Sequence, residues 1–81
     1  MRILIDPDFL KEYEIIKNHL KPFELVELEK LLKEIQENPK KGEELGKTGY
    51  YRLLIELDYN IYILIYEYNK RSNLLTYWSI E

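Results

Sequence analysis

Apolar residues in the first part of the chain recur at helical spacing. Asp6-Pro7-Asp8 has the composition of a helix start, because an aspartate can accept a free backbone N–H and proline fits the first helical position. A stripe at intervals of four, three and four residues follows, made of Phe9, Tyr13, Ile16 and Leu20. We expect this helix to end at Lys21, since the residue before Pro22 is pushed out of helical backbone geometry.

A second stripe predicts a second helix that begins at Pro22 and ends before Asn38-Pro39. Its apolar members are Leu25, Leu28, Leu31, Leu32 and Ile35. Charged residues cover the other side, and the i,i+4 pair Glu29 and Lys33 adds a little helix stability. Because the link between the two helices is so short, we expect them to lie antiparallel as a hairpin.

From Tyr50 onward the apolar period changes to two, which is typical of strands. Tyr51, Leu53, Ile55 and Leu57 fall on one face, and Tyr50, Arg52, Leu54 and Glu56 fall on the other. Polar turns at 58–60 and 69–73 separate three runs that end near residues 57, 68 and 80, so an antiparallel meander is expected. A short apolar run at residues 2–5 predicts one more strand. The predicted fold class is α+β, with a short N-terminal strand and a two-helix antiparallel hairpin packed on a three-stranded meander, in one domain over residues 1–81.

Composition limits the size of the core and indicates the cellular compartment. With 81 residues and 46% hydrophobic content, the chain can build one core, and every apolar face has to contribute to it. It has no cysteine, which excludes disulfides and fits a reducing cytoplasm. The apolar run after Met1 is too short for a signal peptide, so we expect a soluble cytoplasmic protein. The abundance of Glu, Lys and Ile suggests a thermophilic source.

The longest loop has the most distinctive composition. Residues 38–49 hold all three glycines, and the stretch contains Asn38-Pro39 and the Gly-x-x-Leu spacing from Gly42 to Leu45. It leads into the strand through Gly49-Tyr50-Tyr51-Arg52. In this order, between a helix pair and a meander, these features resemble the RelE/ParE family of toxins from toxin–antitoxin pairs. The resemblance covers nearly the whole chain. Members of that family act on mRNA in the ribosome or on DNA gyrase.

The resemblance also implies roles for individual residues. Glu44 stands where a ribosome-dependent nuclease of this family can carry its base, and Arg52 matches the strand arginine that follows the glycine. Tyr77 lies nearest to the place where the family carries an acid. The second arginine of the family has no counterpart at Tyr59-Asn60, and no His or Tyr follows the last strand. The set is therefore incomplete.

Charge and residue type leave alternatives to these roles. Fifteen acids outnumber twelve bases, which is unusual for a nucleic-acid binder, although Lys40, Lys41 and Lys47 could form a local RNA-binding patch. Arg52 could instead pair with Glu56 or Glu44. The single histidine, His19, suits the C-terminal end of the first helix, where a cation favours the helix dipole. No cofactor or metal site is expected, because no motif for either is present.

Tyrosine is abundant, with eight residues in the chain. If Tyr62, Tyr66, Tyr68 and Tyr77 share one sheet face, they could stack on bases. Tyrosine is equally a strand and interface residue, and sheet packing together with a partner surface is the better expectation.

Three functions remain open. The chain could be a toxin that cleaves mRNA in the ribosome, a ParE-like inhibitor that binds gyrase, or an inactive relative that binds a partner. The resemblance implies a cognate antitoxin, which we expect to wrap the helix hairpin and a sheet edge with an amphipathic helix or an added strand. The last strand, with Leu74, Trp78 and Ile80 on one face, is expected to end at a free edge where two copies could pair as a homodimer.

Overall fold

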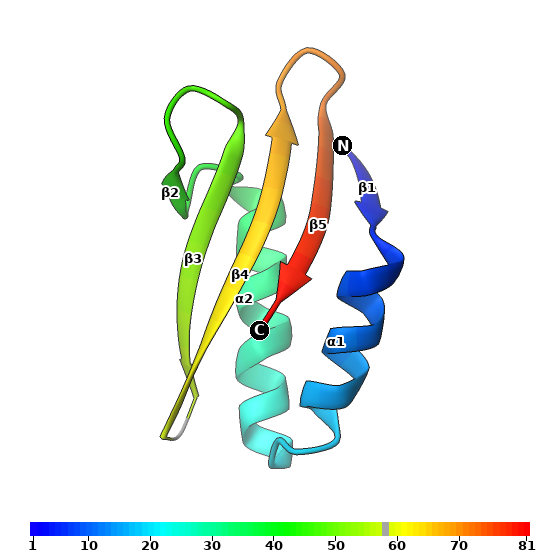
Figure 1. Ribbon diagram of the computed structural model, residues 1–81, viewed down its shortest axis with the longest axis vertical. Coiled ribbons are helices and arrows are strands. Elements are labelled where there is room, and N and C mark those ends of the chain that lie inside the picture. Colours follow the sequence, from blue (N-terminus) through cyan, green and yellow to red (C-terminus); the bar gives the residue numbers. More distant parts are fainter. Residues whose placement is uncertain (58) are drawn as a thin grey trace.

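The computed structural model describes residues 1–57 and 59–81. The elements follow in the order β1 (Arg2–Ile5), α1 (Pro7–Lys17), α2 (Pro22–Glu37), β2 (Glu43–Glu44), β3 (Tyr50–Leu57), β4 (Asn60–Asn69) and β5 (Leu74–Ile80). The α+β prediction is confirmed, with two helices packed against one sheet (Figure 1). Asp58, part of the predicted turn between the first two meander strands, lies outside the described residues.

The sheet has five strands in the order β1-β5-β4-β3-β2. Strands β3, β4 and β5 form the predicted antiparallel meander. Strand β1 pairs parallel to β5, with Ile3 opposite Leu75. The prediction that the last strand ends the sheet is therefore wrong, because the N-terminal strand covers its edge.

The segment between α2 and β3, which is predicted to be a loop, contains a short strand. Glu43 and Glu44 form the short strand β2, which pairs antiparallel with β3 opposite Arg52 and Tyr51. The first helix ends at Lys17 rather than near Lys21, and residues 18–20 form turns.

The helix starts follow local chemistry. Asp6 caps α1, since its Oδ2 accepts a hydrogen bond from the Asp8 backbone N–H at 3.0 Å. At the start of α2, Glu24 Oε1 accepts from the backbone N–H of Lys21 at 2.9 Å. Both helices have proline in the first turn, as the sequence predicts.

The strand period divides β3 as expected. Tyr51, Ile55 and Leu57 are buried on the inner face, and Arg52 and Leu54 are exposed on the outer one. The inner face continues onto the neighbouring strands, where Leu64 lies opposite Ile80 and Tyr66 opposite Tyr77. A register shift at Ile65/Tyr66 accommodates the extra residue of β5.

Both helices cover the inner face, and their stripes complete the core (Figure 1). Phe9 of α1 stacks on Tyr77 with ring centroids 5.2 Å apart. The buried apolar residues are Phe9, Ile16, Leu28, Ile35, Tyr51, Ile55, Leu57, Leu64, Tyr66, Leu75, Tyr77 and Ile80. No helix covers the outer face of the sheet in the part of the chain described, so that face is open (Figure 1).

Replacing Leu28 with alanine tests this packing. Leu28 is 0% exposed, and its removal leaves a cavity between α2 and the sheet, so we expect a loss of about 2–5 kcal/mol in the free energy of unfolding. Val26→Ala is the matched control on the same helix, because Val26 is 64% exposed and should change stability by about 0.5 kcal/mol at most. Urea unfolding followed by circular dichroism measures both. Equal effects of the two substitutions would show that α2 does not pack as described.

Candidate functional site

The open face of the sheet is the accessible surface of its three long strands. Its residues are Tyr50, Arg52, Leu54 and Glu56 of β3, Ile61, Ile63, Ile65 and Glu67 of β4, and Trp78 and Ser79 of β5, with Thr76 of β5 buried opposite Glu67 on the same face. Leu54 lies opposite Ile63, and Trp78 Nε1 donates to Glu67 Oε1 at 3.1 Å. The surface is thus largely apolar, with a few charged groups placed among the apolar ones.

Arg52 is the only cation in β3, β4 and β5. Its Nη2 donates to Glu43 Oε1 at 3.0 Å, across the β2–β3 ladder. The prediction that Arg52 pairs with Glu56 or Glu44 is therefore wrong, because its partner is Glu43. The side chains of Arg52 and Glu43 are 46% and 71% exposed, so solvent screens the pair, and its contribution to stability is small. The guanidinium remains available to a phosphate, whose oxygens match its fork of donors.

Glu44 lies on the other side of the ladder from Arg52. It stands opposite Tyr51, which faces the helices, and its Oε2 accepts from the Gly49 backbone N–H at 3.2 Å. Burial raises the pKa of Tyr51, and the negative charge of Glu44 raises it further. The structure therefore does not bring Glu44 and Arg52 together. The carboxylate beside Arg52 is that of Glu43.

Tyr77 is buried on the inner face, and its hydroxyl donates to the Leu32 carbonyl oxygen at 2.8 Å. Burial also raises its pKa. Because this hydroxyl is enclosed between the sheet and α2, a substrate on the open face cannot reach it. The site described here therefore does not include Tyr77.

The four tyrosines suggested for base stacking do share one face. Tyr66 and Tyr77 are buried there, and Tyr62 and Tyr68 pack at the border of the same core. This is the face that the helices cover, so Tyr66 and Tyr77 are enclosed in the core and the partly buried Tyr62 and Tyr68 pack against it, and the four rings form no open stacking surface for nucleic-acid bases.

The three lysines of the candidate RNA-binding patch lie on or beside the loop that leads to β3. Lys41 pairs with Glu34 of α2 at 3.2 Å. Lys40 and Lys47 are exposed, and among the described residues no carboxylate lies within ion-pair distance of either. His19 is exposed in the turn after α1, as expected for a surface residue at a helix end.

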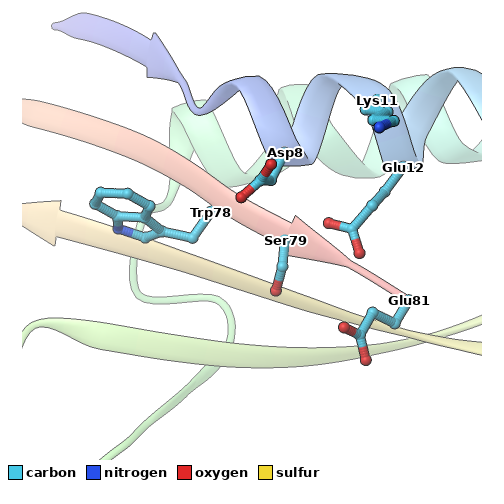
Figure 2. Close-up of a pocket in the computed structure, with 6 residues that line it drawn as sticks. All are labelled: Asp8, Lys11, Glu12, Trp78, Ser79 and Glu81. Carbon is cyan, nitrogen blue, oxygen red and sulfur yellow. The ribbon is translucent and has the colours of Figure 1, made fainter.

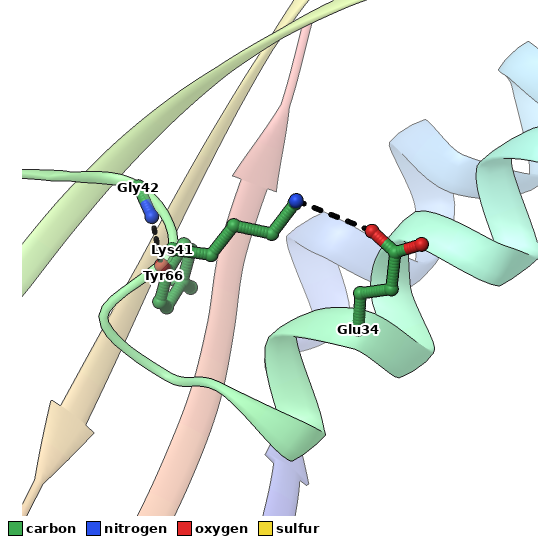
Figure 3. Close-up of polar contacts among 4 residues, drawn as sticks. All are labelled: Glu34, Lys41, Gly42 and Tyr66. Carbon is green, nitrogen blue, oxygen red and sulfur yellow. Dashed lines mark hydrogen bonds and ion pairs between the residues drawn. The ribbon is translucent and has the colours of Figure 1, made fainter.

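Tyr66 fixes the loop to the sheet, a role that its sequence position does not reveal. Its hydroxyl accepts from the Gly42 backbone N–H at 2.8 Å (Figure 3). The same hydroxyl donates to the Pro39 carbonyl oxygen at 2.9 Å. A Cβ on residue 42 would lie 2.9 Å from the Arg52 carbonyl oxygen and 3.0 Å from the Tyr66 hydroxyl. Glycine is therefore required at this position for close packing, and the hydroxyl of Tyr66 sets where β2 meets β3.

A hollow of about 390 Å³ lies between α1 and the end of β5 (Figure 2). Asp8, Glu12 and Glu81 line it together with Lys11, Trp78 and Ser79. Its carboxylates make it a poor phosphate site. Across residues 1–57 and 59–81, no group of three or more His, Asp or Glu residues is placed to hold a metal ion. In that same part of the chain, neither helix combines the length and the apolar character that a membrane span requires.

The Tyr66 hydroxyl can be removed without changing the ring. In Tyr66→Phe the Gly42 N–H and the Pro39 carbonyl lose their shared partner, so we expect a loss of about 1–3 kcal/mol in the free energy of unfolding. The Gly42 amide should also exchange its hydrogen faster. Tyr59→Phe is the control, because Tyr59 is 96% exposed. A Gly42 amide that stays equally protected in Tyr66→Phe would refute the anchoring role.

Alkaline pH should destabilise the fold through its buried tyrosines. Burial raises the pKa of Tyr51, Tyr66 and Tyr77 in the folded state, while the unfolded chain ionises near pH 10. The contribution of these three tyrosines to the free energy of unfolding is complete below about pH 10. It is lost as the pH rises through their higher folded-state pKa values, because the unfolded chain releases these protons first. Urea unfolding between about pH 8 and 11 measures this decline. Tyr77→Phe should reduce it and Tyr59→Phe should not. A free energy of unfolding that does not change over this pH range would contradict the burial of these tyrosines.

Comparison with known proteins identifies the fold. No protein-family model and no curated protein matches the sequence. Among solved structures, the intact E. coli RelBE toxin–antitoxin complex contains a chain that is 23% identical, with a TM-score of 0.71, over 98% of this chain and 92% of that one. E. coli RelE with two arginine-to-alanine substitutions matches in the free state with a TM-score of 0.68, and in complex with a RelB peptide with a TM-score of 0.67. Each of these two comparisons has 23% identity and covers 98% of this chain and 79% of that chain. The chain therefore has the fold of the RelE toxin.

Proposed function

We propose that this chain is the toxin component of a type II toxin–antitoxin module and acts in the cytoplasm. The observation that carries the proposal is the agreement with E. coli RelE over 98% of the chain, which includes both helices and all five strands. The segment from Asn38 to Arg52, whose residues resemble the same family, ends at the one arginine of the three long strands. Fold and local sequence thus support the same role by separate routes.

The proposed partner is a cognate antitoxin, since E. coli RelE occurs in complex with RelB. The open face offers an uncovered apolar surface, because Leu54, Ile61 and Ile63 remain exposed. Glu56 and Glu67 lie on the same face. An amphipathic segment that carries apolar residues and some lysine or arginine would complement this surface in charge and in hydrophobicity.

Two modes of action are consistent with a toxin of this fold. In the first, the chain binds mRNA in the ribosome and assists its cleavage. Arg52 would then bind the scissile phosphate, and Glu43 would accept the proton of the attacking 2′-hydroxyl, with Lys40, Lys41 and Lys47 binding RNA nearby. The 2′-oxygen would bond to phosphorus as the P–O5′ bond breaks, and a water molecule would donate the proton that the departing 5′-oxygen needs. Glu43 takes the role that the family resemblance gives to Glu44, because only Glu43 lies beside Arg52.

In the second mode, the chain inhibits its target by binding and cleaves nothing, as a gyrase inhibitor or a catalytically inactive relative. Three observations favour this mode. Glu44 and Arg52 lie on opposite sides of the β2–β3 ladder, Tyr77 is enclosed in the core, and carboxylates outnumber cations on the open face. An apolar and acidic surface suits a protein better than RNA, whose phosphates need cations.

Controlled expression in a bacterial host tests the toxin role. We expect growth arrest, and we expect co-expression of the protein encoded next to this gene to relieve it. Arg52→Ala should reduce the arrest, because it removes the only cation of the three long strands, whereas Arg71→Ala in the exposed β4–β5 turn should not. Normal growth at a protein level verified by immunoblotting would reject the toxin role.

The mode of action is resolved with the purified protein. If mRNA is cleaved, translating ribosomes should yield cut transcripts by primer extension, and Glu43→Gln should lower the rate by about 100- to 10,000-fold while Glu44→Gln leaves it nearly unchanged. If the chain only binds, transcripts stay intact and gyrase supercoiling or another target activity falls. Equal loss of cleavage in the Glu43 and Glu44 variants would contradict the assignment of Glu43.

A further inference from the structure

Strand β1 forms one edge of the sheet, and nothing among the described residues covers its outer side (Figure 1). All four of its residues are exposed, although three are large and apolar. Ile3, Leu4 and Ile5 keep 43%, 50% and 48% of their surface accessible. The strand contains no proline and no bulge, two of the features that prevent pairing at an edge.

The hydrogen bonds to β5 determine which backbone groups of β1 point outward. The N–H of Arg2 donates to the Asn73 carbonyl, and the N–H of Asp6 donates to the Tyr77 carbonyl, both at 3.0 Å. Backbone groups alternate in direction along a strand, so Arg2, Leu4 and Asp6 bond toward β5. The N–H and C=O groups of Ile3 and Ile5 therefore point away from the sheet and have no strand beside them.

We propose that a second copy of this chain pairs antiparallel with β1, with Ile3 of each copy opposite Ile5 of the other. In this register each Ile3–Ile5 pair exchanges two backbone hydrogen bonds, which gives four across the interface. Leu4 then lies opposite Leu4 of the second copy at the two-fold axis. The two sheets join into one sheet of ten strands.

Charge complementarity selects this register. It places Arg2 of each copy opposite Asp6 of the other, so that the interface is flanked by two opposite-charge pairs. Asp6 uses Oδ2 to accept from the Asp8 N–H, and its second carboxylate oxygen remains for a guanidinium. Pairing Ile5 with Ile5 would set Ile3 against Pro7, which has no N–H to donate. Pairing Ile3 with Ile3 would leave Arg2 opposite Leu4.

The arrangement is closed and isologous, because each copy uses the same edge and no β1 edge is left over. Residues opposite one another in an antiparallel pair lie on the same face, so both helix hairpins lie on one side of the joined sheet and both open faces on the other. The dimer therefore does not cover Arg52, and it does not depend on the proposed toxin role.

The pairing surface is small. A four-residue edge buries less than the roughly 1,200–2,000 Å² of a standard stable interface, so we expect a weak dimer with a dissociation constant of roughly 10 μM to 1 mM. Such an equilibrium is visible only at high protein concentration.

Sedimentation velocity of the full chain from about 10 μM to about 2 mM tests the proposal. The mass should rise from that of one 9.9 kDa chain toward twice that value. Leu4→Lys brings two ammonium groups together at the two-fold axis and should weaken association at least about tenfold. Arg2→Glu, which sets a second carboxylate against Asp6, should also weaken it. Leu54→Lys is the matched control, because Leu54 is similarly exposed on β3 and lies away from the interface.

Circular dichroism and thermal melting serve to check that each variant folds, so that a loss of association is not attributed to unfolding. Three results would overturn the proposal: a monomer over the whole concentration range, undiminished association of Leu4→Lys, or equal weakening of association by Leu54→Lys.

Discussion

The helix hairpin covers only one face of the sheet, and this single constraint decides what every strand residue can do. Since side chains alternate between faces, each residue of β3 and β4 either packs under the helices or stays on the open face. Ile55 and Tyr66 belong to the first class, and Arg52 and Leu54 to the second. Chemistry with a substrate is possible only for the second class and for the loops beside it.

This division separates residues that are close in sequence. Glu43 and Glu44 are neighbours, yet only Glu43 contacts the guanidinium of Arg52. Tyr77 holds α2 through the Leu32 carbonyl and is a structural residue. Tyr66 acts similarly on the loop, because its hydroxyl joins Pro39 and Gly42 and thereby aligns β2 with β3. The accessible surface that results is apolar and acidic around one arginine, and a protein partner fits it more readily than a phosphate backbone does.

The sequence alone predicts much of the layer structure. The stripe from Phe9 to Leu20 and the alternation from Tyr50 to Leu57 identify the helices, the strands and the buried face, because hydrophobic period reflects local geometry directly. Pairing between distant segments has no such local signal. The parallel contact of β1 with β5 joins the two ends of the chain, and the Glu43–Arg52 pair depends on the two-residue strand β2. Neither contact can be predicted from the local pattern of residues. Gly42 is part of the glycine pattern of the loop, but the reason for a glycine at this position, the close approach of the Tyr66 hydroxyl and the Arg52 carbonyl, exists only in three dimensions.

The most direct test of this account measures which side chains of β3 are accessible. The chain has no cysteine, so single substitutions Arg52→Cys, Leu53→Cys, Leu54→Cys and Ile55→Cys provide one thiol each for a maleimide reagent under native conditions. The account predicts alternation, with fast labelling at positions 52 and 54, slower labelling at 53 and the slowest at 55, and equal rates after unfolding. Uniform native rates, or faster labelling at 53 and 55 than at 52 and 54, would contradict the assignment of the covered and open faces.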